Sequence, residues 1–165
     1  MGEIKLWDIT ELVRKVLRIV ALVFILFIAV RYGGKMADSY LANLIDSLIW
    51  RESKGDPKAI SSVGARGLGQ IMPSVLTDYN KTHKTNYTSD DLFDPTINRN
   101  ITIWHFTNNL PMQLANKGMA PTLEALLGAY NVGAKGLVRG DKPAKRYIVD
   151  ILNRAGVIPP EYTAE

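Results

Sequence analysis

A continuous apolar run near the N-terminus constrains the fold of this chain more than any other feature. Residues 19–30 read IVALVFILFIAV, and the apolar segment extends to 16–32 when Arg18 and Arg31 are accepted near its ends. A helix over 16–32 is roughly 25 Å long, slightly less than the roughly 30 Å hydrocarbon core of a bilayer, and long Arg side chains can reach the interfaces. We therefore predict one transmembrane helix within an N-terminal segment of residues 1–35.

Two other interpretations of the apolar run stay open. It has the length of a signal-peptide core, although no A-x-A-like cleavage site follows it, and it could be a helix that packs inside the protein or on a partner. Four Lys and Arg residues precede the run and two closely follow it, so the positive-inside rule places the N-terminus in the cytoplasm and the rest of the chain on the outer side. The rest divides into a globular domain, 36–155, and a loose tail, 156–165.

The net charge of +4 resides mostly in the N-terminal segment. Residues 1–35 hold six Lys and Arg against three Asp and Glu, whereas the remaining residues hold 14 against 13. A nucleic-acid-binding domain needs a basic face, so this balance argues against nucleic acid as a partner. The chain has no cysteine, and its two histidines, His83 and His105, lack the spacing of metal ligands. We therefore expect neither disulfides nor a metal site.

The globular part has the apolar spacing of helices. A helix is predicted over 38–53, because apolar side chains recur there every three or four residues. No strand-like alternation stands out, so the predicted fold class is mainly α. The further helices are expected over 73–80, from Pro95 with a break or restart at Pro111, over 121–130 and over 143–155.

Glu52 is the first candidate catalytic residue. It lies three residues after Ile49 and four after Leu48, so it continues the apolar stripe of the predicted helix instead of its solvent face. Burial raises the pKa of a carboxyl group, which could keep Glu52 protonated near neutral pH and ready to act as a general acid. A glutamate that reaches solvent or pairs with an arginine would give the same pattern. Asp56 is a weaker candidate, because it precedes Pro57 in a predicted turn.

Five sequence blocks occur in a defined order along the globular part. Together they resemble the catalytic domain of soluble lytic transglycosylases, a lysozyme-like family, over about residues 38–152. The blocks are Glu52-Ser53 with residues 55–61, residues 64–73 (GARGLGQIMP), residues 91–95 (DLFDP) with Asn98, residues 129–133 (AYNVG), and Tyr147 within residues 146–149.

The resemblance implies roles for six residues. Glu52 matches the catalytic acid and base. The positions that match the glycan cleft or adjoin the catalytic carboxyl are Ser53, Gln70, Tyr130, Asn131 and Tyr147. For Ser53, hydrogen bonding at the end of its helix is the alternative role.

Three positions depart from the family pattern. Gly69 stands where the family often has methionine, Thr102 replaces a common glycine, and His105 stands where tyrosine is usual. These departures concern the subsites of the cleft and not the chemistry.

The resemblance implies an enzyme that needs no cofactor and acts on peptidoglycan. It would cleave the β-1,4 bond between N-acetylmuramic acid (MurNAc) and N-acetylglucosamine (GlcNAc) and leave 1,6-anhydro-MurNAc ends. A muramidase that uses water, a catalytically silent glycan-binding assembly protein and a holin-like membrane-permeabilising protein are the alternatives.

With the predicted anchor in the lipid bilayer, the catalytic domain would face the periplasm from a bacterial inner membrane. A virion membrane, or secretion after signal cleavage, are the alternative locations. Both a phage that penetrates the wall and a bacterial envelope machine would use such an enzyme for local opening, with virion or secretion-complex proteins as possible partners.

Overall fold

A computed structural model describes residues 20, 23, 34, 35 and 37–157 of this chain. The predicted transmembrane segment 16–32 falls outside the described residues except at positions 20 and 23, and so does the predicted tail after residue 157. Within the described residues, no helix combines the length and apolarity needed to cross a bilayer. Residues 42–165 form one compact unit, distinct from residues 1–41, and the fold below is that of the described part of this unit.

The described part is built almost entirely from helices, which confirms the predicted mainly α class. A helix whose described part includes residues 37–53, called the first helix below, is followed by a loop over residues 54–72, in which Arg66 forms isolated β-bridges with Ile60 and Ile71. The elements that follow are α2 (Pro73–His83), the short 3-10 helix η1 (Asp91–Phe93), α3 (Pro95–Trp104), the π-helix η2 (His105–Asn109), α4 (Leu110–Ala115), α5 (Leu123–Val132), α6 (Ala134–Val138) and α7 (Lys145–Arg154).

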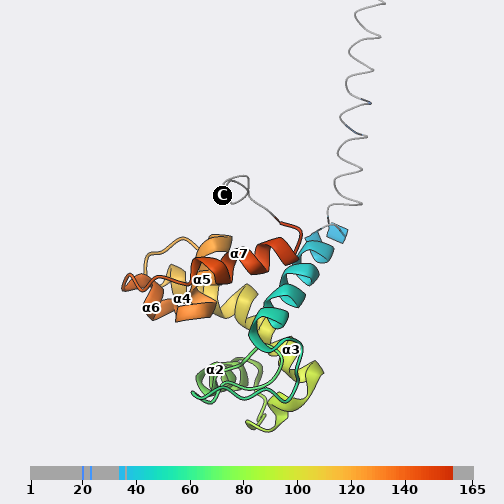
Figure 1. Ribbon diagram of the computed structural model, residues 1–165, viewed down its shortest axis with the longest axis vertical. Helices are drawn as coiled ribbons and strands as arrows, with labels where there is room; N and C mark the ends of the chain where they lie inside the picture. Colours follow the sequence, from blue (N-terminus) through green and yellow to red (C-terminus); the bar gives the residue numbers. More distant parts are fainter. Residues whose placement is uncertain (1–19, 21–22, 24–33, 36, 158–165) are drawn as a thin grey trace, which may run out of the picture. The chain divides into compact units, whose positions relative to one another are not determined.

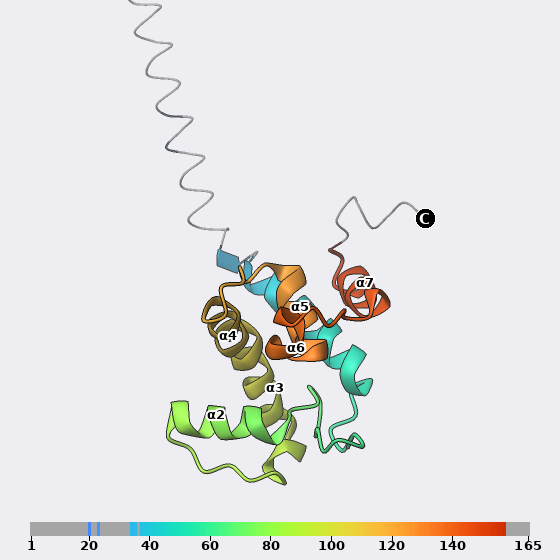
Figure 2. The same ribbon diagram turned by 90° about the vertical axis from the view of Figure 1, so that its left-hand side faces the viewer.

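The helices form two groups, and α3 runs between them. Figures 1 and 2 both show α2 at one end of the unit and α4, α5, α6 and α7 at the other. Each group has its own apolar cluster. The first cluster holds Ile71, Leu76, Leu92 and Ile101, and the second holds Leu110, Leu114, Ala129 and Ala134.

Local chemistry sets the start of two helices. The Asp94 carboxylate accepts hydrogen bonds from the backbone N–H groups of Thr96 and Ile97, and Pro95 occupies the first turn, so α3 begins where the sequence predicts. The Thr122 hydroxyl accepts from the Ala125 N–H and starts α5 two residues after Pro121, the predicted start. Helix α7 likewise begins at Lys145, two residues after the predicted Pro143.

The chain continues through Pro111 by widening the helix. Proline lacks an N–H group, and its ring collides with the carbonyl four residues earlier in an α-helix. The preceding residues form one π-turn, in which the Leu110 N–H donates to the His105 carbonyl, and α4 then resumes with Pro111 in its first turn. The predicted break or restart at Pro111 corresponds to this π-turn, which comes just before Pro111, and to the resumption of the α-helix at Leu110.

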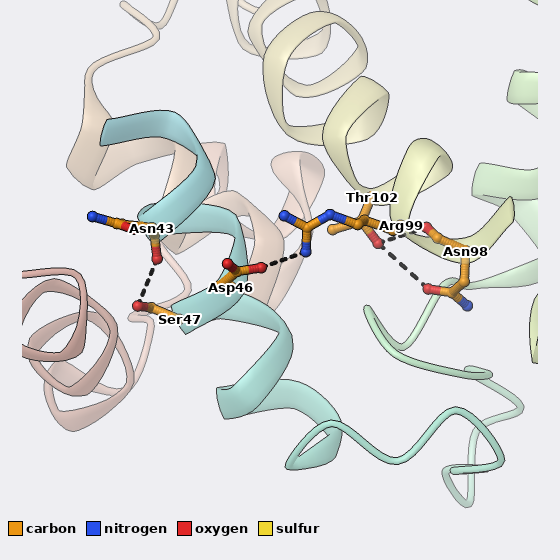
Figure 3. Close-up of polar contacts among 6 residues, drawn as sticks. All are labelled: Asn43, Asp46, Ser47, Asn98, Arg99 and Thr102. Carbon is orange, nitrogen blue, oxygen red and sulfur yellow. Dashed lines mark hydrogen bonds and ion pairs between the residues drawn. The ribbon is translucent and has the colours of Figure 1, made fainter. Parts of the chain in front are cut away.

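The first helix is tied to α3 by a side-chain ion pair. Arg99 on α3 donates to the carboxylate of Asp46, and Figure 3 shows the two side chains meeting between these helices. Also on α3, Asn98 and Thr102 are both fully buried. This exposed ion pair joins α3 to the helix whose last turn carries Glu52.

Candidate active site

Glu52 lies in the last turn of the first helix, as the sequence predicts. The helix buries Leu44, Ile45, Leu48 and Ile49, and Glu52 continues that stripe at the point where the helix ends. Ser53 stabilises this end, because its hydroxyl donates to the Ile49 carbonyl (3.3 Å) and accepts from the Gly55 N–H (3.1 Å). Ser53 therefore adjoins the candidate catalytic group with its own side chain engaged at the helix terminus.

Tyr147 is the direct partner of Glu52. Its side chain is only 3% exposed on α7, and its hydroxyl donates a hydrogen bond to the Glu52 carboxylate. Sequence positions 95 residues apart are thereby brought into contact. The structure therefore brings together two of the residues to which the resemblance assigns a role.

The pKa of Glu52 is raised above its ordinary value of 4.5. Burial is the main cause, because it penalises the charged carboxylate, while the hydrogen bond from Tyr147 and the charge of Arg51 act in the opposite direction. Such a carboxyl can hold a proton at a higher pH than a solvent-exposed glutamate and release it to a substrate oxygen.

Arg51 was not singled out by the sequence, yet it contacts the site. Its guanidinium lies 5.2 Å from the centre of the Tyr147 ring and 3.7 Å from the Asp150 carboxylate. The charge of Arg51 favours the ionised form of Glu52. A single cation beside a catalytic glutamate gives no distinctive sequence signal, which explains why the motif analysis missed it.

Tyr130 belongs to the same cluster, because the charge of Glu52 acts on its hydroxyl. Its hydroxyl donates to the carbonyl of Gly69 (2.7 Å), and its ring lies 5.4 Å from that of His105. Burial raises its pKa, and the charge of Glu52 raises it further. Tyr130 and Tyr147 both stay neutral beside Glu52 over the ordinary pH range, because burial and the Glu52 charge also raise the pKa of Tyr147.

Gln70 stands at the end of the glycine-containing turn. Its backbone has a φ of 49°, and its amide nitrogen donates to the carbonyls of Gly67 (3.1 Å) and Ala59 (3.3 Å). The side chain therefore braces the loop that carries Gly69. A left-handed backbone is uncommon for a residue other than glycine.

Asn131 connects the end of α5 to the start of α7. It is exposed, and its side-chain oxygen accepts from the Ala144 N–H (3.3 Å), directly before α7. Asp56, the weaker carboxylate candidate, accepts from the Lys58 N–H (2.8 Å) and shapes the turn at Pro57. The turn interpretation of Asp56 therefore agrees with its contacts.

A concave surface that encloses about 620 Å³ lies between α2 and α4, and its lining residues do not include Glu52, Tyr130 or Tyr147. Asn109 in its wall contacts the ring of His105 (3.2 Å), and the Gln113 amide donates to Asn109 (3.0 Å). Burial lowers the pKa of His105 to about 4, so this ring is neutral and packs against Tyr130. The concave surface offers an indole, amides and charged groups. Its lining residues include Trp104, Met112, Asn109, Gln113, Asn116 and Lys117.

The described residues contain no cluster of three or more His, Asp or Glu side chains that could hold a metal ion. The groups that interact with the Glu52 carboxyl include the phenols of Tyr147 and Tyr130 and the guanidinium of Arg51.

The chain matches the Transglycosylase SLT domain over residues 34–147, a range that runs through Glu52 and ends at Tyr147. This chain belongs to the SLT transglycosylase domain family. Comparisons with curated proteins and with solved structures found no match. The family assignment confirms the resemblance drawn from the sequence blocks, and it makes the chain a glycan-cleaving enzyme of the lytic transglycosylase type whose substrate is peptidoglycan.

Proposed function

We propose that this SLT domain cleaves the MurNAc-GlcNAc β-1,4 bond of peptidoglycan with Glu52 as its single acid and base, and leaves 1,6-anhydro-MurNAc ends. The observation that carries the proposal is the half-buried Glu52 carboxyl with its raised pKa, held by the Tyr147 hydroxyl. Most glycosidases use two carboxylates, and substrate-assisted enzymes are the exception. The contacts of Asp56 within its turn support the single-carboxyl mechanism.

The proposed reaction needs Glu52 to give one proton and then to take a different one. Protonated Glu52 donates to the glycosidic oxygen as the bond to the MurNAc anomeric carbon breaks, and the 2-acetamido group of MurNAc stabilises the positive charge on that carbon. The Glu52 carboxylate then removes the proton from the 6-hydroxyl of the same MurNAc, whose oxygen attacks the anomeric carbon and closes the anhydro ring. The first proton stays on the 4-hydroxyl of the released GlcNAc, and the proton of the 6-hydroxyl restores Glu52, so atoms and charge balance within the substrate and Glu52.

The tyrosines support this cycle in two ways. The Tyr147 hydrogen bond stabilises the carboxylate formed after the first proton transfer and fixes the direction of its oxygens. Tyr130, whose pKa is also raised, stays neutral and adds no negative charge near Glu52. Asn131 and Gln70 lie on the two segments that meet at this point, and we assign them contacts with the sugar.

The concave surface between α2 and α4 supports binding of a long glycan. Carbohydrates bind through aromatic faces and amide hydrogen bonds, and Trp104, Asn109 and Gln113 offer both. The Gln113–Asn109–His105 contacts link this surface to Tyr130. We therefore place further sugars of the strand here.

Mass spectrometry of the fragments released from purified peptidoglycan tests the proposed reaction. The chain should release anhydro-MurNAc ends, and a Glu52→Gln variant, which keeps the shape and loses the acid, should release none. Reducing MurNAc ends would replace the proposal with a muramidase. No release by the folded native chain would favour a silent glycan-binding protein.

We further propose that residues 16–32 anchor the enzyme in a bacterial inner membrane, with the catalytic domain in the periplasm. The apolar run and the excess of Lys and Arg before it support this orientation. Local opening of the wall, during phage penetration or for an envelope machine, is the role that we assign to it. Reporter fusions after residue 165 that work only in the periplasm should be active, whereas cytoplasmic activity would contradict the orientation.

A further inference from the structure

Gly69 occupies a position where backbone conformation does not require glycine. The glycines of this chain with left-handed φ values include its neighbour Gly67 (φ 71°), and Gly69 is not among them. What excludes a side chain at Gly69 is a neighbour. A Cβ atom there would lie 2.0 Å from the Thr102 hydroxyl oxygen and 3.1 Å from the Thr102 Cβ and methyl carbons. The two positions compete for one volume.

Thr102 cannot leave this volume easily. It is fully buried on α3, and its hydroxyl donates to the Asn98 carbonyl one turn earlier (2.9 Å), as Figure 3 shows. Asn98 is also fully buried, and its side-chain oxygen accepts from the Gly69 N–H (2.8 Å). Its amide nitrogen donates to the carbonyls of Arg66 (2.9 Å) and Leu92 (2.8 Å). The turn around Gly69 is therefore held directly against α3.

The Gly69 carbonyl connects this turn to the catalytic cluster. The Gly69 carbonyl accepts the hydrogen bond of the Tyr130 hydroxyl (2.7 Å), and the charge of Glu52 acts on that same hydroxyl. Thr102 itself lies within hydrogen-bonding reach of Tyr130. A displacement of Gly69 by a side chain pressed against Thr102 would thus move the acceptor that orients Tyr130.

We propose that Thr102 is a positioning residue of this enzyme, which acts through Gly69 to hold Tyr130 beside Glu52. Gly69 and Thr102, both departures from the family pattern, form one matched pair: a small residue on the turn and a larger one on α3. The inference rests on the proposed function of Glu52. Its consequence is that a side chain at position 69 becomes acceptable only when position 102 loses its own.

A double-mutant cycle on the full chain tests this pair. Gly69→Ala should lower kcat by roughly 100-fold, because misplacement of a catalytic constellation by about 1 Å has effects of that order. Thr102→Gly alone should lower kcat much less. The double variant Gly69→Ala/Thr102→Gly should recover kcat to the level of Thr102→Gly. Values of kcat are taken per folded molecule, and KM should change little throughout.

Gly67→Ala serves as the matched control in the same turn. Gly67 has a left-handed backbone, and a Cβ there would lie 2.2 Å from the Leu92 carbonyl oxygen and 2.3 Å from the Asn98 amide nitrogen. Thr102→Gly should therefore not rescue Gly67→Ala. A Gly69→Ala variant with native kcat, or a double variant no better than Gly69→Ala, would overturn the proposal.

The pair and the proposed function fail in different ways. If the native chain releases no glycan fragments, the proposed function fails whatever the variants do. If the native chain is active and Thr102→Gly restores the unfolding midpoint of Gly69→Ala but not its kcat, the pair is only structural and the positioning role is overturned.

Discussion

The Tyr147 hydroxyl donates its hydrogen bond to the Glu52 carboxylate, across 95 residues of sequence, and so joins the last described helix to the end of the first. This contact places a neutral donor on the group that must both give and take a proton. It lowers the pKa of Glu52 against the larger effect of burial, which raises it. The balance between these effects governs the pH dependence of the enzyme.

Tyr147→Phe should reduce kcat by about 10- to 100-fold, because hydrogen bonds to charged groups contribute about 1.5–3 kcal/mol. The loss of the donor also raises the pKa of Glu52, so the alkaline limb of the pH–rate profile should move to higher pH. Tyr40→Phe, at a tyrosine with 42% exposure, serves as the control and should leave both quantities unchanged. An unshifted alkaline limb in a folded Tyr147→Phe variant would show that Tyr147 does not tune Glu52.

Arg51→Gln should shift the same limb in the same direction. The Arg51 charge lowers the pKa of Glu52, so its removal leaves burial less opposed and the proton is held to higher pH. Because the guanidinium contacts the ring of Tyr147 and not the carboxylate, kcat at the optimum should fall less than in Tyr147→Phe. Arg139→Gln, on an exposed arginine paired with Asp141, provides the matched charge change away from the site. A shift of equal size in both variants would mean that only net charge matters.

Glu52→Gln should stabilise the fold at alkaline pH while it removes activity. Between the ordinary pKa of 4.5 and the raised pKa in the folded state, the folded protein binds more protons at this site than the unfolded chain. The stability that Glu52 contributes is therefore present at low pH and is lost as the pH rises through its folded pKa.

Thermal unfolding of both proteins across pH measures this effect. The unfolding midpoint of Glu52→Gln should exceed that of the native chain at about pH 8, and the difference should shrink at about pH 4. Asp78→Asn, at an exposed carboxyl on α2, should show no such pattern. A Glu52→Gln variant that is less stable than the native chain at every pH would refute burial as the dominant influence on Glu52.

Much of this organisation is readable from the sequence because helices and their caps are local. The apolar stripe that includes Leu48 and Glu52 predicted both the first helix and the burial of the carboxyl. Asp94-Pro95 and Pro111 marked helix boundaries through side-chain capping and the missing proline N–H. The short helix α6 was missed, since five residues that include Gly136 carry too little periodicity.

The contacts across the site are less accessible to such reasoning, because they depend on how distant segments pack. The ordered sequence blocks indicated that Glu52, Tyr130 and Tyr147 share a site, but no pattern showed that Tyr130 would bind the Gly69 carbonyl. Gly69 and Thr102 could each be seen as unusual in the sequence. Only the distance between them shows that a side chain at position 69 would occupy the space of the Thr102 side chain.

Removal of polar groups from the concave surface between α2 and α4 should affect long glycans alone. Asn116 and Lys117 line this surface, and both are exposed at the end of α4. In an Asn116→Ala/Lys117→Ala double variant, KM for long peptidoglycan strands should rise by up to about tenfold, the effect of roughly one lost hydrogen bond.

Cleavage of a tetrasaccharide too short to reach the surface should be unchanged, since the contacts of Glu52, Tyr130 and Tyr147 stay intact. Asn100→Ala/Lys142→Ala removes the same groups from exposed positions outside this lining and should change neither substrate. Because a bound strand gains affinity from each occupied subsite, an equal rise in KM for both substrates would place these residues at the reacting sugars instead, and no change for either would remove the surface from the path of the glycan.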